Sequence, residues 1–214
     1  MEATDYRIRV KGISGECRLT IDNIYTKYGQ GRTQGRTQSG ITYWVTGSMT
    51  NSSLIINIVG DNRVGGIHYN NRWQDSNNKL IFKGNGALTV ASYGADDNWW
   101  NAAIGNSDNY SSCYGIQIDG GIIFAGTKKS ENCTAIGGGG NGVGKVTING
   151  GVVTAVAATT GTAIGGGIGF NSTGGIGLVT ITGGTVYAYN LDNGHYIPSS
   201  AIGSAGSRDG YGSG

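Results

Sequence analysis

Residues 135–155 read AIGGGGNGVGKVTINGGVVTA, and the chain repeats parts of this segment on both sides of it. The opening tripeptide, Ala-Ile-Gly, occurs four times, beginning at Ala103, Ala135, Ala163 and Ala201. Successive copies are therefore 32, 28 and 38 residues apart. A repeat of this length is typical of a solenoid, in which each repeat forms one coil that packs against the next.

Two segments of each repeat alternate apolar and polar residues, as β-strands with one buried face do. The first segment precedes a Gly-Gly pair and reads IQI, VTI and VTI at residues 116–118, 146–148 and 179–181. The second follows the pair and reads IIFA, VVTA and TVYA at residues 122–125, 152–155 and 185–188, with ALTV at 87–90 as a less exact copy. Its second and fourth positions are predicted to face inward, and its third position outward.

The Ala-Ile-Gly tripeptide is the third predicted strand, with its isoleucine facing inward and glycines at the corners. Three strands and three turns make one coil of a right-handed parallel β-helix, for which we expect about six coils. A propeller blade needs four antiparallel strands, and a leucine-rich repeat needs regularly spaced leucines, so neither fits. Residues 1–16 are expected to form an N-terminal cap that includes a strand at 6–10, and residues 17–214 a single β-helix domain.

Composition excludes several classes of protein. The chain has 42 glycines without a Gly-X-Y period and only one proline, which excludes collagen. Its net charge is +2, and it has no run of five like charges, so nucleic acid is not an expected partner. No apolar stretch is long enough to span a membrane, so no membrane insertion is expected. We expect a monomer that is part of a longer protein, because residues 210–214 read as the beginning of another loop.

The three cysteines are Cys17, Cys113 and Cys133. None lies in a Cys-x-x-Cys pair, which argues against a zinc site. Cys113 and Cys133 flank two strands of one coil, so a disulfide between them is one hypothesis. The alternative is that the cysteines are buried thiols that pack as small apolar residues.

Residues 19–23 (LTIDN), residues 80–90 (LIFKGNGALTV) and the glycine-rich repeats together resemble a family of bacterial β-helix modules. These modules recur in large surface proteins of Gram-positive gut anaerobes, and they are described as carbohydrate-binding-domain-containing or pectate-lyase-like. The resemblance covers about residues 17–205. It implies an extracellular location on the cell surface, but it brings no catalytic residue that can be placed on this chain.

The densest group of candidate binding residues is Trp99 and Trp100 beside Asp96 and Asp97. Indole rings stack on sugar rings, and carboxylates bind hydroxyl groups or calcium, the one cofactor that the sequence suggests. The alternative is that one tryptophan covers Phe124 on the neighbouring coil.

Other loop residues are expected to line the same edge as Trp99 if the loops stack in register. These residues are Asp192, His195 and Tyr196. A groove suited to a polysaccharide that lies along the helix axis would then be lined by Tyr93, Trp99, Trp100, Lys128, Lys129 and Tyr196. A protein ligand would instead contact Trp73, Trp99, Trp100 and Tyr110.

Catalysis is not expected. Glycoside hydrolysis needs two carboxyl groups about 5 to 9.5 Å apart, whereas Asp96 and Asp97 are adjacent and point apart in an extended segment. Asp119 occupies a corner where Asn149 and Thr182 stand in other repeats, so it reads as a turn former.

We therefore expect a non-catalytic, adhesin-like surface module that binds a polysaccharide or a host glycoprotein. The alternatives are a binder of a host protein such as immunoglobulin or mucin polypeptide, a structural stalk, and a polysaccharide lyase or glycoside hydrolase.

Overall fold

A computed structural model describes residues 7–12, 14–26, 40–46, 49–74, 77–93, 102–106, 112–128, 134–157, 161–168, 175–191 and 200–206. Within these ranges the chain forms eighteen β-strands and no helix. Among these residues there is accordingly no helix of the length and hydrophobicity that crossing a membrane requires.

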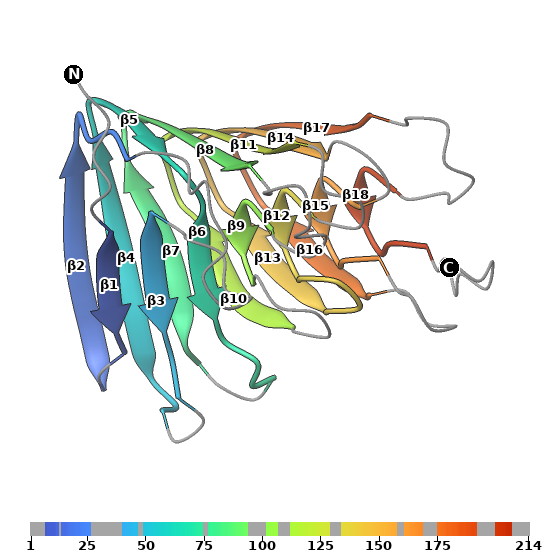
Figure 1. Ribbon diagram of the computed structural model, residues 1–214, viewed down its shortest axis with the longest axis horizontal. Helices are drawn as coiled ribbons and strands as arrows, with labels where there is room; N and C mark the ends of the chain where they lie inside the picture. The colour runs from blue at the N-terminus through green and yellow to red at the C-terminus, as the bar shows by residue number, and fades with distance from the viewer. Residues whose placement is uncertain are drawn as a thin grey trace.

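The strands form three parallel sheets (Figure 1). The seven-stranded sheet contains, in spatial order, β1 (Ile8–Lys11), β3 (Ile41–Trp44), β6 (Ile67–Asn70), β9 (Ile104–Gly105), β12 (Ile136–Gly137), β15 (Ile164–Gly165) and β18 (Ile202–Gly203). The six-stranded sheet contains β2 (Gly15–Asp22), β4 (Ser52–Val59), β7 (Lys79–Gly84), β10 (Cys113–Ile118), β13 (Gly144–Ile148) and β16 (Gly177–Ile181). The five-stranded sheet contains β5 (Asp61–Val64), β8 (Ala87–Tyr93), β11 (Ile122–Lys128), β14 (Val152–Ala157) and β17 (Thr185–Asn190).

The chain visits one strand of each sheet in turn, which confirms the right-handed parallel β-helix expected from the repeats. Five turns of the described chain carry all three strands, from β4-β5-β6 to β16-β17-β18. The turn before them has β2 and β3, with only an isolated bridge between Tyr25 and Arg63 on the third side. The number of complete coils is thus slightly lower than the expected six.

The strand expected to cap the N-terminal end is itself part of the solenoid. β1 pairs in parallel with β3 over four residues and is the first strand of the seven-stranded sheet. Its inward residues, Ile8 and Val10, are half-buried and pack against the core. The strand therefore lies beside its neighbours in the sheet rather than across the end of the coil.

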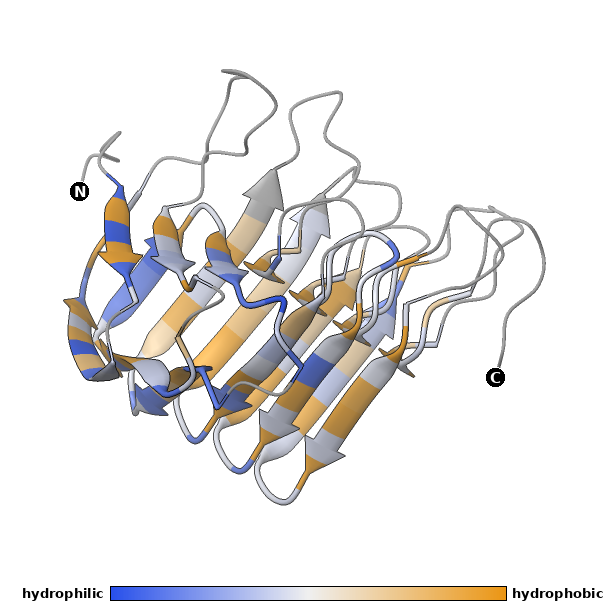
Figure 2. Ribbon diagram, turned by 90° about the horizontal axis from the view of Figure 1, so that it is seen from below, coloured by the Kyte–Doolittle hydropathy of each residue, from blue (hydrophilic) through white to orange (hydrophobic). Residues whose placement is uncertain are grey.

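The core consists of columns of inward side chains that run along the stack. Ile104, Ile136 and Ile164 of the repeated tripeptide are fully buried, and so is Ile148 of β13. Ile202 occupies the same column in the last turn and is partly exposed. Figure 2 shows the apolar bands that recur along the strands. Like residues lie above like residues because all of these strands pair in parallel and in register.

The interior of the N-terminal turns also contains polar groups. The rings of Tyr43 and Tyr69 stack with centroids 5.3 Å apart. The Tyr43 hydroxyl shares a hydrogen bond of 2.7 Å with Ser52, and the Asn71 amide donates to the Tyr69 hydroxyl at 2.9 Å. The Cys113 thiol donates to the carbonyl of Tyr69 at 3.6 Å. These bonds satisfy groups whose burial would otherwise cost free energy.

Burial makes this region sensitive to alkali. Burial raises the pKa of the Cys113 thiol and that of the Tyr69 phenol. In the unfolded chain both groups lose their protons at lower pH than in the folded chain, so their contribution to stability is complete below the unfolded pKa values and falls above them. We expect the free energy of unfolding to decrease above about pH 9, as measured by urea unfolding at a series of pH values. Cys113→Ala should make this decrease shallower, and an unchanged pH dependence would contradict the assignment.

Candidate functional site

Most of the loop residues proposed from the sequence lie outside the described residues. These are Asp96, Asp97, Trp99, Trp100, Tyr110, Lys129, Asp192, His195 and Tyr196. Tyr93 and Lys128 end strands β8 and β11 of the five-stranded sheet. The groove and the calcium site at Asp96 and Asp97 therefore remain predictions.

Trp73 is among the described residues, and it lies next to a different sheet from Tyr93 and Lys128. It follows β6 of the seven-stranded sheet, its side chain is exposed, and its backbone N–H donates to the Asn71 side chain at 3.5 Å. Tyr93 belongs to a different sheet. The two residues are thus not neighbours in one sheet, although the sequence suggested both as ligand contacts.

The described cysteines and acidic residues do not form a metal site. Cys113 is a free and fully buried thiol in the structure, as the alternative to the disulfide expects. Cys133, its proposed partner, lies outside the described residues. The described part of the chain has no group of three or more His, Cys, Asp or Glu side chains placed to hold a metal ion.

Asp119 belongs to a polar ladder along one corner of the solenoid. Its carboxylate accepts hydrogen bonds from Gln117 at 2.9 Å and from Asn149 at 2.8 Å, and the Lys83 ammonium lies 3.7 Å away. Asn149 in turn accepts a hydrogen bond from the Thr182 hydroxyl at 2.7 Å. The repeated polar residue at this corner therefore ties one coil to the next, in agreement with its interpretation as a turn residue.

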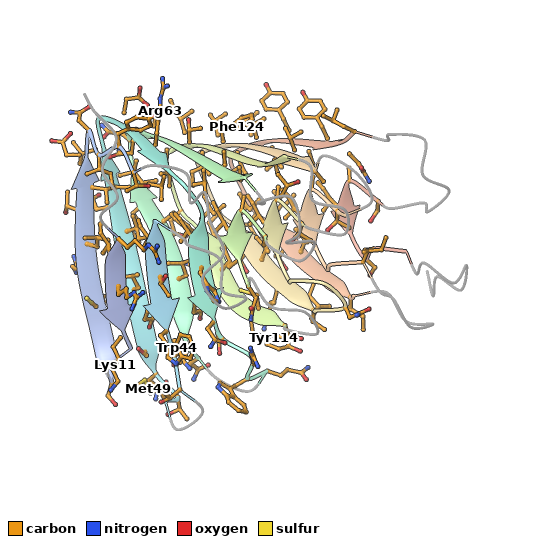
Figure 3. All side chains as sticks on the ribbon, in the orientation of Figure 1. Lys11, Trp44, Met49, Arg63, Tyr114 and Phe124 are labelled. Carbon is orange, nitrogen blue, oxygen red and sulfur yellow. The ribbon has the colours of Figure 1, made fainter. Side chains whose placement is uncertain are left out.

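A group of exposed apolar and aromatic side chains covers the outer surface of the five-stranded sheet. We call it the aromatic face, and it consists of Ile122, Phe124, Val152, Tyr187 and Tyr189. Phe124, Tyr187 and Tyr189 are 42%, 47% and 49% exposed, and Figure 3 shows Phe124 pointing away from the interior.

The strand period places these residues on one surface. On β11, β14 and β17 more exposed and less exposed residues alternate, so every second side chain points outward. Phe124 pairs with Thr154, and Thr154 pairs with Tyr187, so the two rings occupy the same column two strands apart. At ordinary strand spacing this separation is about 9.6 Å.

Gly126 lets the ring of Phe124 lie along its strand. A Cβ atom at Gly126 would come within 3.1 Å of Cε1 of Phe124, so the ring extends over the bare glycine backbone. A side chain at this outward position would compete for that space. The glycine therefore helps to present Phe124 as a flat platform.

The aromatic face carries little charge. Lys128 is the only charged residue in the sequences of β8, β11, β14 and β17. The nearest charges toward the N-terminal end belong to Asp61 and Arg63 of β5, which lie 4.0 Å apart. The face is thus suited to an uncharged ligand that contributes apolar surface and hydroxyl groups.

Sequence reasoning identified Phe124 and Tyr187 as outward residues but did not assign them to a site. The signal was present in the repeats, because the outward column that holds Thr89 and Thr154 also holds these two large rings. The register of the strands confirms that the two rings share this column, with β14 between them.

No protein-family model, no curated protein and no solved structure matches this chain. Function is therefore inferred from the chemistry of its surface.

Proposed function

We propose that this chain is a non-catalytic recognition module of a bacterial cell surface, and that the aromatic face binds a neutral polysaccharide. The observation that carries the proposal is the row of exposed rings on a rigid, nearly uncharged sheet. Contiguous exposed apolar surface of this kind marks interaction sites in soluble proteins.

Sugar chemistry fits this surface. A pyranose ring has a face of C–H groups that packs on an aromatic ring, while its hydroxyl groups need polar partners at the edge. Tyr187, Tyr189 and Thr154 supply hydroxyl groups beside the rings. Because the strands are held in a parallel sheet, the platform is ordered before binding, which lowers the entropic cost of association.

The spacing of the rings also suggests how the ligand lies. Phe124 and Tyr187 are about 9.6 Å apart along the solenoid axis, roughly the length of two linked pyranose rings. In an extended β-linked chain, alternate sugars present the same face to one side. We therefore propose that the polysaccharide lies parallel to the axis and that every second sugar stacks on a ring.

Affinity electrophoresis through a panel of neutral polysaccharides tests this proposal. Burying an aromatic side chain contributes about 1.5–3 kcal/mol, so Phe124→Ala and Tyr187→Ala should each weaken binding at least about tenfold. The matched control is Leu178→Ala, which removes an exposed apolar side chain from β16 of another sheet. If both aromatic variants migrate like the unchanged protein, the aromatic face is not the sugar site.

The same experiment separates the other functions considered. If the Phe124→Ala variant still binds the polysaccharide and the Trp99→Ala variant does not, the sugar site is the segment that contains Trp99. Unsaturated products, detected by ultraviolet absorbance, would indicate a lyase. Binding to a mucin that survives removal of its glycans would indicate a protein ligand.

A further inference from the structure

We propose a second binding surface, on the N-terminal end of the seven-stranded sheet, that takes an acidic polysaccharide. It is independent of the aromatic face, which belongs to a different sheet. We call it the basic row, and it consists of Arg7, Arg9, Lys11 and Trp44.

Strand alternation creates the row. Ile8 and Val10 of β1 turn toward the core, whereas Arg9 and Lys11 are exposed, and Arg7 immediately before the strand is exposed as well. The ribbon nearest the N-terminus in Figure 2 shows this alternation as blue and orange bands. Every second residue of a strand is about 6.6–6.8 Å from the last, so three cations stand in a line at nearly equal intervals.

An aromatic ring lies beside this line. Lys11 pairs with Trp44 of β3 in the parallel register, and the indole is 43% exposed. Figure 3 shows Lys11 and Trp44 together at the same end of the sheet. An ammonium group next to an exposed ring can engage a carboxylate and the sugar that carries it at the same time.

Nothing in the described strands of this sheet neutralises the row. No Asp or Glu occurs in β1, β3, β6, β9, β12, β15 or β18. The ion pairs of the described residues use other cations, namely Arg18 with Glu16, Arg63 with Asp61 and Lys83 with Asp119.

The N-terminal part of the sequence, which contains the basic row, carries an excess of positive charge. Residues 1–46 contain seven Lys and Arg against four Asp and Glu, a net charge of +3. Residues 47–214 contain eight against nine, a net charge of −1. The basic row therefore lies in the more basic part of the sequence, which favours a polyanion as its ligand.

The size of the row favours an acidic polysaccharide over nucleic acid. Affinity for DNA comes mainly from neutralising many phosphates, about six to ten in a strongly salt-dependent complex, whereas the described row offers three cations along about 13 Å. A sugar chain with a carboxylate on successive or alternate residues matches so short a row, and the indole provides a stacking partner for one of its sugars.

The test compares carboxymethyl-dextran with dextran, because the two polymers differ only in carboxylate groups. We expect carboxymethyl-dextran to retard the protein and dextran not to retard it. The retardation should weaken as the salt concentration rises. The double variant Arg9→Gln, Lys11→Gln should bind carboxymethyl-dextran at least about tenfold more weakly, and its binding should depend less on salt. The single variant Trp44→Ala should also weaken binding, but with the same salt dependence as the unchanged protein.

A charge-matched control is available on the six-stranded sheet. The double variant Lys79→Gln, Lys145→Gln also removes two positive charges, from exposed positions of β7 and β13. This variant should bind carboxymethyl-dextran as the unchanged protein does. Equal weakening in both double variants, or no retardation of the unchanged protein, would overturn the proposal. Tighter binding to a single-stranded oligonucleotide than to carboxymethyl-dextran would overturn it in favour of nucleic acid. A thermal melt of each variant checks that the fold is kept. The Phe124 variants test the neutral-sugar site, so failure of one proposal does not affect the other.

Discussion

Ile148→Asp is expected to unfold the central turns of the solenoid. Ile148 is fully buried on β13 and lies in register between Ile118 of β10 and Ile181 of β16. Loss of a buried isoleucine alone costs about 2–5 kcal/mol, and a carboxylate in its place has no partner in an apolar column. The sum is comparable with the whole stability of an ordinary domain, about 5–15 kcal/mol.

Thr147→Asp provides the control on the same strand. Thr147 precedes Ile148 and points to the opposite side, where it is partly exposed. A carboxylate there remains solvated, so the melting temperature measured by circular dichroism should change little. The Ile148 variant should lose its cooperative melt, and acid should partly restore it because a protonated aspartic acid is easier to bury. A cooperative, unchanged melt would show that Ile148 does not lie in the core.

The repeats allowed most of the fold to be predicted. Strict alternation around Thr147 and Thr154, interrupted by Gly-Gly pairs, is compatible with short strands and tight corners but with no helix. Because the same pattern returns in successive repeats, one copy predicts the inward column of all the others. The buried side chains of Ile123, Val153 and Ile136 confirm that assignment.

Strand β5 could not be predicted by the same pattern. Its sequence, Asp61–Val64, places the polar Asn62 at the inward position that Leu88 occupies in the next turn. The Asn62 side chain is nonetheless fully buried, because its amide donates to Val59 and Ala87 carbonyls and its oxygen accepts from the Ile24 backbone. Hydrogen bonds here stabilise a strand that apolar periodicity does not indicate.

The two proposed surfaces were missed for different reasons. The repeats place Phe124 and Tyr187 in one outward column, but they do not show that both rings stay exposed on the folded sheet. The basic row was overlooked because a search for runs of like charge does not detect Arg9 and Lys11, which are separated by the inward Val10. Reading charge at every second position of a predicted strand would have found it.

Gly137→Ala is the second substitution for which we expect a large loss of stability. The glycines of the repeated tripeptide form a column, and Gly137 has φ +140°, a conformation that residues with side chains rarely adopt. A Cβ atom there would overlap the carbonyl oxygen of Gly165, the equivalent glycine of the next coil. That oxygen accepts the hydrogen bond from Gly138 N–H at 3.0 Å, so it has no freedom to move without breaking the pairing of the two coils.

Gly15→Ala is the control that introduces backbone strain without a steric overlap. Gly15 also has a positive φ, +102°, but an added Cβ atom meets nothing within 4 Å. Its substitution should cost only the conformational strain, about 1–2 kcal/mol, measured by urea unfolding. Gly137→Ala should cost at least about twice as much, because it adds a backbone overlap inside the stack. In a solenoid each coil is stabilised by its neighbours, so separation of the coils at Gly137 and Gly165 should split the unfolding transition in two. Equal losses for the two variants would mean that the coils tolerate a methyl group between them and that the glycine column is needed only for its φ angle.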